Sequence, residues 1–411
     1  MTRTEIDDRR RERRYAGPAL FEYGFRVFFL GAGLQAALAM LAWVTWMTAQ
    51  SLGIAPEMIT VAGSIHLWHA HEMIFGYGLA VVAGFFLTAV PGWTGRQPVR
   101  GTLLAVLFGL WLLGRASSWA SAWVPAAVIA LPELAFIGLL SLLVAHALLA
   151  GRAKRNFVFL PVLAILFAAA ALHHAEAMGL ADGLSETGQL LAIDALLVLL
   201  TVVGGRIVPA FTTNALRRDG VEPLPRAADR RDAAAILLMV ALLAADLVAP
   251  ASVATGWVAL AAALAGALRM VGWRPGRVLS SPILWVLHLG YAWLVLGLLL
   301  KGFALIGGSM PEILALHILT IGALGTMTLG VMTRAGLGHT GRALKVSGAI
   351  TLSYLLVSLA AAIRVLWPLF DLPFGDLAII TSGLLWSAAF VIFTIVYWPV
   401  LTRPRLAAAS A

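Results

Sequence analysis

Three histidines and a glutamate stand at the start of a long apolar run, in the stretch "HLWHAHEMIFGYG" (66–78). Histidine is the commonest metal ligand among protein side chains, which gives His66, His69 and His71 their chemical interest. On an α-helix, His66 and His69 lie about 60° apart, whereas His71 lies about 160° from His69. His69 and His71 therefore cannot hold one metal ion. They serve two neighbouring sites, or one site and one structural hydrogen bond, unless all three are interfacial histidines solvated at a membrane surface.

The composition requires a membrane around this stretch. Of the residues, 61% are hydrophobic and 12% are charged, and the mean hydropathy is +0.92. Runs of about 20 apolar residues span a bilayer as helices. The chain offers twelve such runs: 27–47, 68–90, 102–121, 124–150, 156–178, 188–212, 232–249, 252–272, 282–304, 311–333, 345–367 and 376–401. We predict an all-α polytopic membrane protein of about twelve helices.

The basic loops predict its orientation. Lysine and arginine crowd the amino-terminal arm, the carboxyl tail and the exit of every even-numbered helix, so both termini are expected in the cytoplasm. The predicted organisation is a basic arm (1–26), a single transmembrane domain (27–401) and a tail (402–411). The net charge of +9 follows from this topology and from anionic lipid, rather than from a nucleic-acid partner. With no cysteine, a disulfide, a thiolate metal site and a covalently attached c-type haem are excluded.

The second helix recurs later in the chain. Residues 71–96 and 317–342 align without a gap and agree at His71/His317, Gly76/Gly322, Gly84/Gly330, Ala89/Ala335, Gly92/Gly338, Thr94/Thr340, Gly95/Gly341 and Arg96/Arg342. A weak third copy (192–217) keeps Gly205, Ala210 and Arg217. Helices two, six and ten are then equivalent, which divides the chain into three pseudo-equivalent four-helix units: 27–150, 156–272 and 282–401.

Equivalent histidines on two helices suggest a cofactor between them. His71 and His317 are predicted to face each other as the axial ligands of a haem, with small residues letting helices or a flat cofactor approach. The alternative is two structural histidines in a duplicated scaffold. Arg115 and Arg364, roughly equivalent on helices three and eleven, are the expected partners of the haem propionates, or else ordinary snorkelling arginines.

Other histidines offer weaker sites. His173 and His174, in "ALHHAEAMG", lie at the same membrane face as His66 and His69, and the four suit a small copper or other metal site. Interfacial solvation explains them nearly as well. His288 and His339 are alternative metal or haem ligands near the cytoplasmic face. The competing interpretation is that they make buried structural hydrogen bonds.

Further charged groups lie within the predicted helices. Asp194 and Asp246 either form salt bridges between helices or belong to a proton path.

These motifs carry a family resemblance. "WHAHEMIFGYGLAVVAGFFLTAVPGWTG", "GGRIVPAFTTN", "WVLHLGYAWL" and "LGVMTRAGLGHTGR" resemble the NnrS family of bacterial inner-membrane proteins, over nearly the whole chain. The resemblance implies a twelve-helix protein that contains haem and copper and is linked to denitrification and to nitric oxide stress. The family's pattern matches here at His69, His71, His288, His317 and His339.

The architecture is also similar to subunit I of the haem-copper oxidases, although a fold does not fix a function. The oxidase pattern places copper-ligating histidines on helices six and seven, where this chain has none. A respiratory oxygen-reducing centre is therefore not expected.

Two functions remain. In the first, a b-type haem near the periplasmic face binds, senses or turns over nitric oxide or a related small ligand, with an unidentified electron donor. Six-coordinate bis-histidine haem favours electron transfer, so a ligand must dissociate or a second metal must be open for small-molecule chemistry. In the second, a secondary transporter carries a metal or a metal-nitrosyl species along the histidines. The repeat is parallel and the helices around the histidines are expected to be unbroken, both of which disfavour transport.

Overall fold

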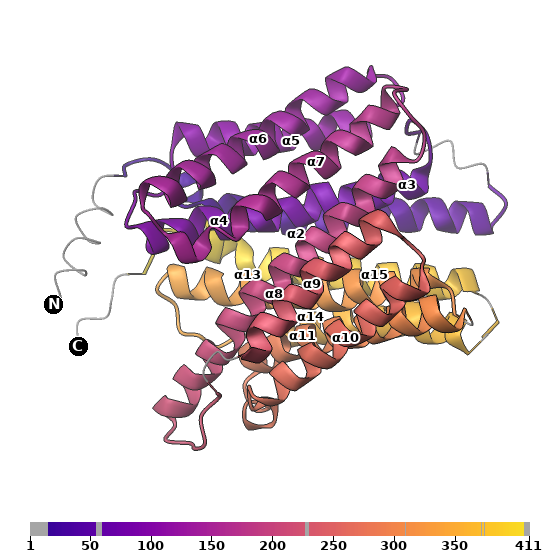
Figure 1. Cartoon of the computed structure of the whole chain (residues 1–411). Helices are drawn as coiled ribbons and strands as arrows, with labels where there is room; N and C mark the ends of the chain where they lie inside the picture. Colours follow the sequence, from indigo (N-terminus) through magenta and orange to yellow (C-terminus); the bar gives the residue numbers. More distant parts are fainter. Residues whose placement is uncertain are drawn as a thin grey trace.

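The computed structural model describes residues 15–54, 60–226, 230–308, 310–370, 372–373 and 375–406. Within these residues the chain is a bundle of helices without a strand (Figure 1). In chain order the elements are η1 (Ala19–Phe21), α2 (Gly24–Ser51), α3 (Ile65–His71), η2 (Glu72–Gly78), α4 (Leu79–Thr94), α5 (Thr102–Trp119), α6 (Ala126–Ala150), η3 (Lys154–Asn156), α7 (Phe159–Ala177), α8 (Leu184–Arg218), α9 (Arg230–Val248), α10 (Val253–Val271), η4 (Pro275–Arg277), α11 (Pro282–Gly307), α12 (Glu312–His317), η5 (Ile318–Gly325), α13 (Thr326–His339), α14 (Gly348–Leu369) and α15 (Gly375–Thr402).

Continuous helices match the predicted number of helices, twelve. The segments α3, η2 and α4 follow one another without a break, as do α12, η5 and α13, so the described chain forms twelve long helices. Eleven of them are long and apolar enough to cross a membrane, and α9 falls short because it carries Arg230, Arg231, Asp232 and Asp246. The prediction of an all-α polytopic membrane protein is confirmed. Such runs fold as helices in lipid because a helix satisfies its own backbone hydrogen bonds.

Four helices form the interior of the bundle. The apolar windows of α2, of α3–η2–α4, of α8 and of α12–η5–α13 are the most buried ones. The last three are the second, sixth and tenth helices, which the repeat predicts to be equivalent. The division into three four-helix units stays a prediction.

The two ends of the bundle's chain meet at one face. Arg26, in the first turn of α2, donates hydrogen bonds to the backbone carbonyls of Leu401 (3.0 Å) and Arg403 (2.7 Å), near the end of α15. The start of α2 and the end of α15 therefore lie side by side (Figure 1). Which side of the membrane this face occupies stays a prediction.

The repeated glycines bring helices together. A Cβ atom would lie 2.5 Å from the Phe29 ring at Gly84 and 2.9 Å from Leu287 at Gly330. At Gly76 it would lie 3.0 Å from Gln35, and at Gly322 it would lie 3.0 Å from Trp293. Each position thus faces a side chain of a neighbouring helix. Of the two explanations for these glycines, close helix packing is the one that the contacts support.

Candidate functional site

A π-helix follows each of the two repeated histidines. His71 ends α3 and is followed by η2, and His317 ends α12 and is followed by η5. The corresponding helix of the weak middle copy, α8, is α-helical throughout. The helices around both histidines are continuous, as predicted, but each contains a π-helical segment that the sequence did not predict. π-Helices are rare and frequently mark functional sites, so both histidines gain interest.

His71 lies in a buried cluster of ionisable side chains. It is 2% exposed, and its Nδ1 lies 3.1 Å from Glu72 Oε1 while its Nε2 lies 3.1 Å from Glu133 Oε1. His174 Nε2 lies 3.0 Å from the same Glu133 oxygen, and His173 stacks on His71 with ring centroids 4.4 Å apart. Both ring nitrogens of His71 are thus occupied by carboxylates from η2 and α6.

Arg115 of α5 joins the two carboxylates. Its guanidinium donates to Glu72 Oε1 at 2.5 Å and to Glu133 Oε2. Gln35 Nε2 (2.6 Å) and Trp119 Nε1 (3.2 Å) donate to the other Glu72 oxygen. Two carboxylates and one guanidinium carry a net charge of −1. Because buried charges have to be balanced, the cluster needs one further positive charge. A protonated histidine or a metal ion would supply it.

Three members of this cluster have the arrangement of a metal site. The donor atoms of His71, Glu133 and His174 all lie within 4.8 Å of one another, and all three residues are buried. Imidazole and carboxylate ligands suit copper, zinc and iron. The same Nε2 atoms cannot hold a proton and a metal together, so metal binding here would compete with protonation.

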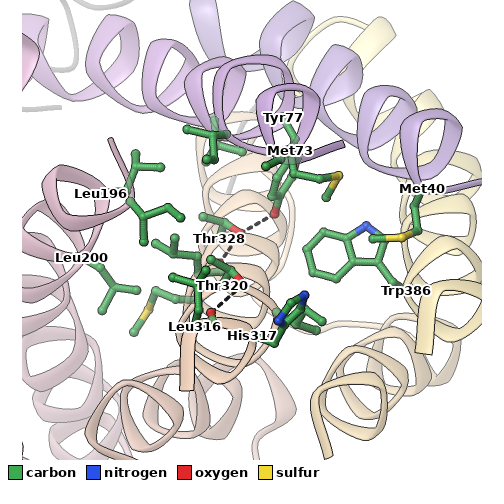
Figure 2. Close-up of a pocket in the computed structure, with 18 of the residues that line it drawn as sticks. Met40, Met73, Tyr77, Leu196, Leu200, Leu316, His317, Thr320, Thr328 and Trp386 are labelled. Carbon is green, nitrogen blue, oxygen red and sulfur yellow. Dashed lines mark hydrogen bonds between the residues drawn. The ribbon is translucent and has the colours of Figure 1, made fainter. Parts of the chain in front are cut away.

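A separate pocket of about 420 Å³ opens between the interior helices. Figure 2 shows His317 and Trp386 beside this space, with the Tyr77 hydroxyl and Thr328 Oγ1 joined by a hydrogen bond across it. Most of the lining is apolar: Met40, Met47, Met73, Val81, Val82, Phe85, Ile193, Leu196, Leu199, Leu200, Leu316, Ile321, Leu324, Met327 and Val331. The polar groups are few and include His66, His69, His317 and Arg364. An apolar cavity with a small number of polar groups is the usual form of a cofactor or ligand site.

Of the three histidines that line the pocket, His69 and His317 are the two less exposed ones, and different contacts hold them. His317 Nδ1 lies 2.7 Å from the carbonyl oxygen of Ile313 and therefore donates to it, which leaves the lone pair on Nε2. His69 stacks on Trp43, with centroids 4.6 Å apart and planes inclined by 23°, and its Nδ1 is buried without a hydrogen-bond partner. Each imidazole thus keeps a nitrogen that no described side chain occupies.

The arginines of the repeat have different surroundings. Arg115 is neutralised by Glu72 and Glu133, whereas no carboxylate in the described part of the chain forms an ion pair with Arg364. One cause is visible in the repeat itself, because Ile318 stands where the first copy has Glu72. Arg364 is therefore a cation at the pocket that is free to meet an anionic group.

The histidine groupings predicted from the sequence are rearranged in the structure. His69 lines the pocket and His71 lies in the buried cluster, so the two side chains point to different places, as the helical angle predicts. His71 and His317 do not meet, since His71 lies in the buried cluster and His317 lines the pocket. The four-histidine copper set is likewise divided. His66 and His69 lie against Trp43 at the pocket, whereas His173 and His174 belong with His71.

His288 and His339 lie apart and contact different residues. His288 Nε2 lies 2.9 Å from Thr212 Oγ1, between α11 and α8, and His339 at the end of α13 packs against Phe25 at 5.5 Å. These contacts favour structural roles. The meeting of Glu72, Glu133 and Arg115 in one cluster was not predicted. The available signal was that isolated charges within apolar runs must find partners.

The family model described as "NnrS protein" matches residues 19–405. No curated protein matches the chain.

Proposed function

We propose that this chain, which belongs to the NnrS family, is a haem-binding protein of the bacterial inner membrane. Its proposed role is in the response to nitric oxide. The observation that carries the proposal is the apolar pocket, which His69 and His317 line together with the unpaired Arg364. The role in nitric oxide stress rests on the family resemblance.

The pocket residues fit a b-type haem. The cavity of about 420 Å³ is in the range of about 300–1,000 Å³ that is usual for ligand sites. His69 and His317 would hold the haem iron, and Arg364 would pair with a propionate. We assign His69 rather than His71 as the partner of His317, because carboxylates occupy both ring nitrogens of His71. When bound, the haem iron supplies one-electron transfer and a site for a small ligand.

The pocket also suits a small neutral ligand. His317 is fixed by its bond to the Ile313 carbonyl, whereas His69 is held by stacking and has a buried Nδ1 without a partner. His69 is therefore the side chain that moves aside more easily. The apolar lining excludes water and accepts an uncharged diatomic molecule such as nitric oxide.

The cluster of His71, Glu133 and His174 is the proposed place for copper. It lies outside the pocket lining and has two imidazoles and one carboxylate within 4.8 Å. These side chains would hold the ion, and Arg115 and Glu72 would fix the orientation of Glu133 and His71.

A copper titration tests this site. His174→Ala removes one ligand and is expected to lower bound copper by one ion per chain, whereas His173→Ala is expected to keep it. His173 contacts His71 through ring stacking and is not one of the three ligands. Metal content is measured by elemental analysis after dialysis. Equal copper in wild type and His174→Ala would show that the cluster is an ion-pair network.

The haem proposal is tested by a reduced-minus-oxidised optical spectrum of the wild-type protein, purified in detergent from haem-replete cells. We expect low-spin haem bands that change when nitric oxide is added to the reduced protein. A colourless preparation would exclude the haem proposal and leave the transporter alternative.

A further inference from the structure

A second buried ionic cluster lies on the side of α8 that faces α9 and α11. Asp194 of α8, Asp246 of α9 and Lys301 of α11 are 4%, 3% and 3% exposed. Lys301 Nζ lies 2.8 Å from Asp246 Oδ2 and 3.2 Å from Glu312 Oε1, at the start of α12. None of these four side chains lines the pocket or belongs to the His71 cluster.

The charges of this cluster do not balance without a further ligand. The buried part has two carboxylates and one ammonium group, and Asp194 and Asp246 lie within hydrogen-bonding reach of each other. Two ionised carboxylates cannot share a hydrogen bond, because neither has a proton to donate. Asp194 Oδ2 and both Asp246 oxygens are moreover buried without a hydrogen-bond partner, and of these only Asp246 Oδ2 has an ion-pair contact, with Lys301.

The described parts of the neighbouring helices supply no further cation. The ionisable groups that face Asp194 are Asp246, Lys301 and Glu312. On α10, the single ionisable residue is Arg269, which pairs with Asp232 at the other end of α9. On α7, His174 bonds to Glu133, and Glu176 accepts a bond from Ser185. An additional positive charge must therefore come from outside the described side chains.

We propose that the Asp194–Asp246 pair is a proton-binding site, which holds one proton between the two carboxylates at neutral pH. The bound proton makes one aspartate the donor to the other and brings the buried charge, with Lys301, to zero. A metal ion is the weaker choice, because the ammonium group of Lys301 already lies 2.8 Å from Asp246.

Glu312 connects this site to the surface. Its side chain is 38% exposed and lies 3.2 Å from Lys301, while the Lys301 side chain is 4% exposed. A proton that leaves or enters the aspartate pair thus has a short route along Lys301 and Glu312 to the face of the bundle where α12 begins. Acid–base exchange is the whole step: an aspartate O–H bond breaks or forms, and no oxidant or reductant takes part.

Infrared spectroscopy of the full-length protein in lipid vesicles tests the proposal. At neutral pH we expect a carbonyl stretching band of a protonated carboxylic acid that shifts when aspartate is labelled with carbon-13. The label separates this band from Glu72 and Glu133. Asp194→Asn and Asp246→Asn are each expected to abolish it, whereas Asp182→Asn, at an exposed aspartate, keeps it.

A second variant keeps the test independent of folding defects. Lys301→Met removes the buried ammonium group, so the pair is expected to stay protonated to a higher pH and the labelled band to persist further into the alkaline range. A wild-type protein without a label-sensitive band at neutral pH would overturn the proposal, and so would a band that both asparagine variants retain. Neither result depends on haem content.

Discussion

Replacing His69 or His317 by glutamine is expected to abolish the low-spin haem spectrum or convert it to a high-spin one, whereas His71→Gln is expected to leave it unchanged. The reason is the position of each ring. His69 and His317 line the same pocket with a free nitrogen, and His71 has both nitrogens bound to carboxylates outside it. Without one of these two imidazoles, the pocket would hold the haem iron by a single histidine or would lose the haem.

The three variants are compared by optical spectroscopy and haem content at equal protein concentration. Glutamine keeps a hydrogen-bonding side chain in each place, which limits the damage at the buried His71. Size-exclusion chromatography in detergent verifies that each variant is folded. Loss of haem from His71→Gln together with retention in His69→Gln would restore the pairing of His71 with His317 that the repeat predicts.

Arg115→Met is expected to destabilise the protein by about 3–5 kcal/mol, because it leaves an uncompensated charge in a buried ion network. Arg115 bonds to both Glu72 and Glu133, and all three are buried. Arg364→Met, at the equivalent place in the repeat, is expected to change stability far less, since Arg364 has no ion-pair partner among the described residues.

Unfolding of the two variants in a detergent denaturation series measures this difference. Arg364→Met is expected to weaken haem retention instead, because it removes the cation proposed for a propionate. Similar losses of stability in both variants would contradict the assignment of the two arginines to different sites.

The fold follows from the sequence to a large extent. Apolar runs of about 20 residues predict twelve helices, and each run forms a helix because lipid leaves the backbone no other partner. The 3.6-residue period also predicts that His69 and His71 face different sites.

Which residues meet in the pocket and in the His71 cluster depends on tertiary contacts that no local sequence pattern predicts. The orientation of a helix about its axis is set by contacts such as His71 with Glu133, which is 62 residues away in the chain. The repeat suggests equal surroundings for His71 and His317, and single differences such as Glu72 against Ile318 remove that equality. No local pattern in EMIFGYG or ILTIGALG predicts the π-helices η2 and η5 either.

These two π-helices set the rotation of α4 and α13, and so determine which of their residues face the pocket. A π-turn differs from an α-turn by about one inserted residue, and each residue of an α-helix turns the chain by about 100°. The same eight residues of η5, wound as an α-helix, would rotate α13 relative to α12 by about 100°, so Thr328 and Val331 would leave the cavity while His317 stayed. The extra residue in η5 thus sets the rotation of the lining residues of α13 about the helix axis relative to His317. This rotation can change without a substitution of His317 or of a lining residue.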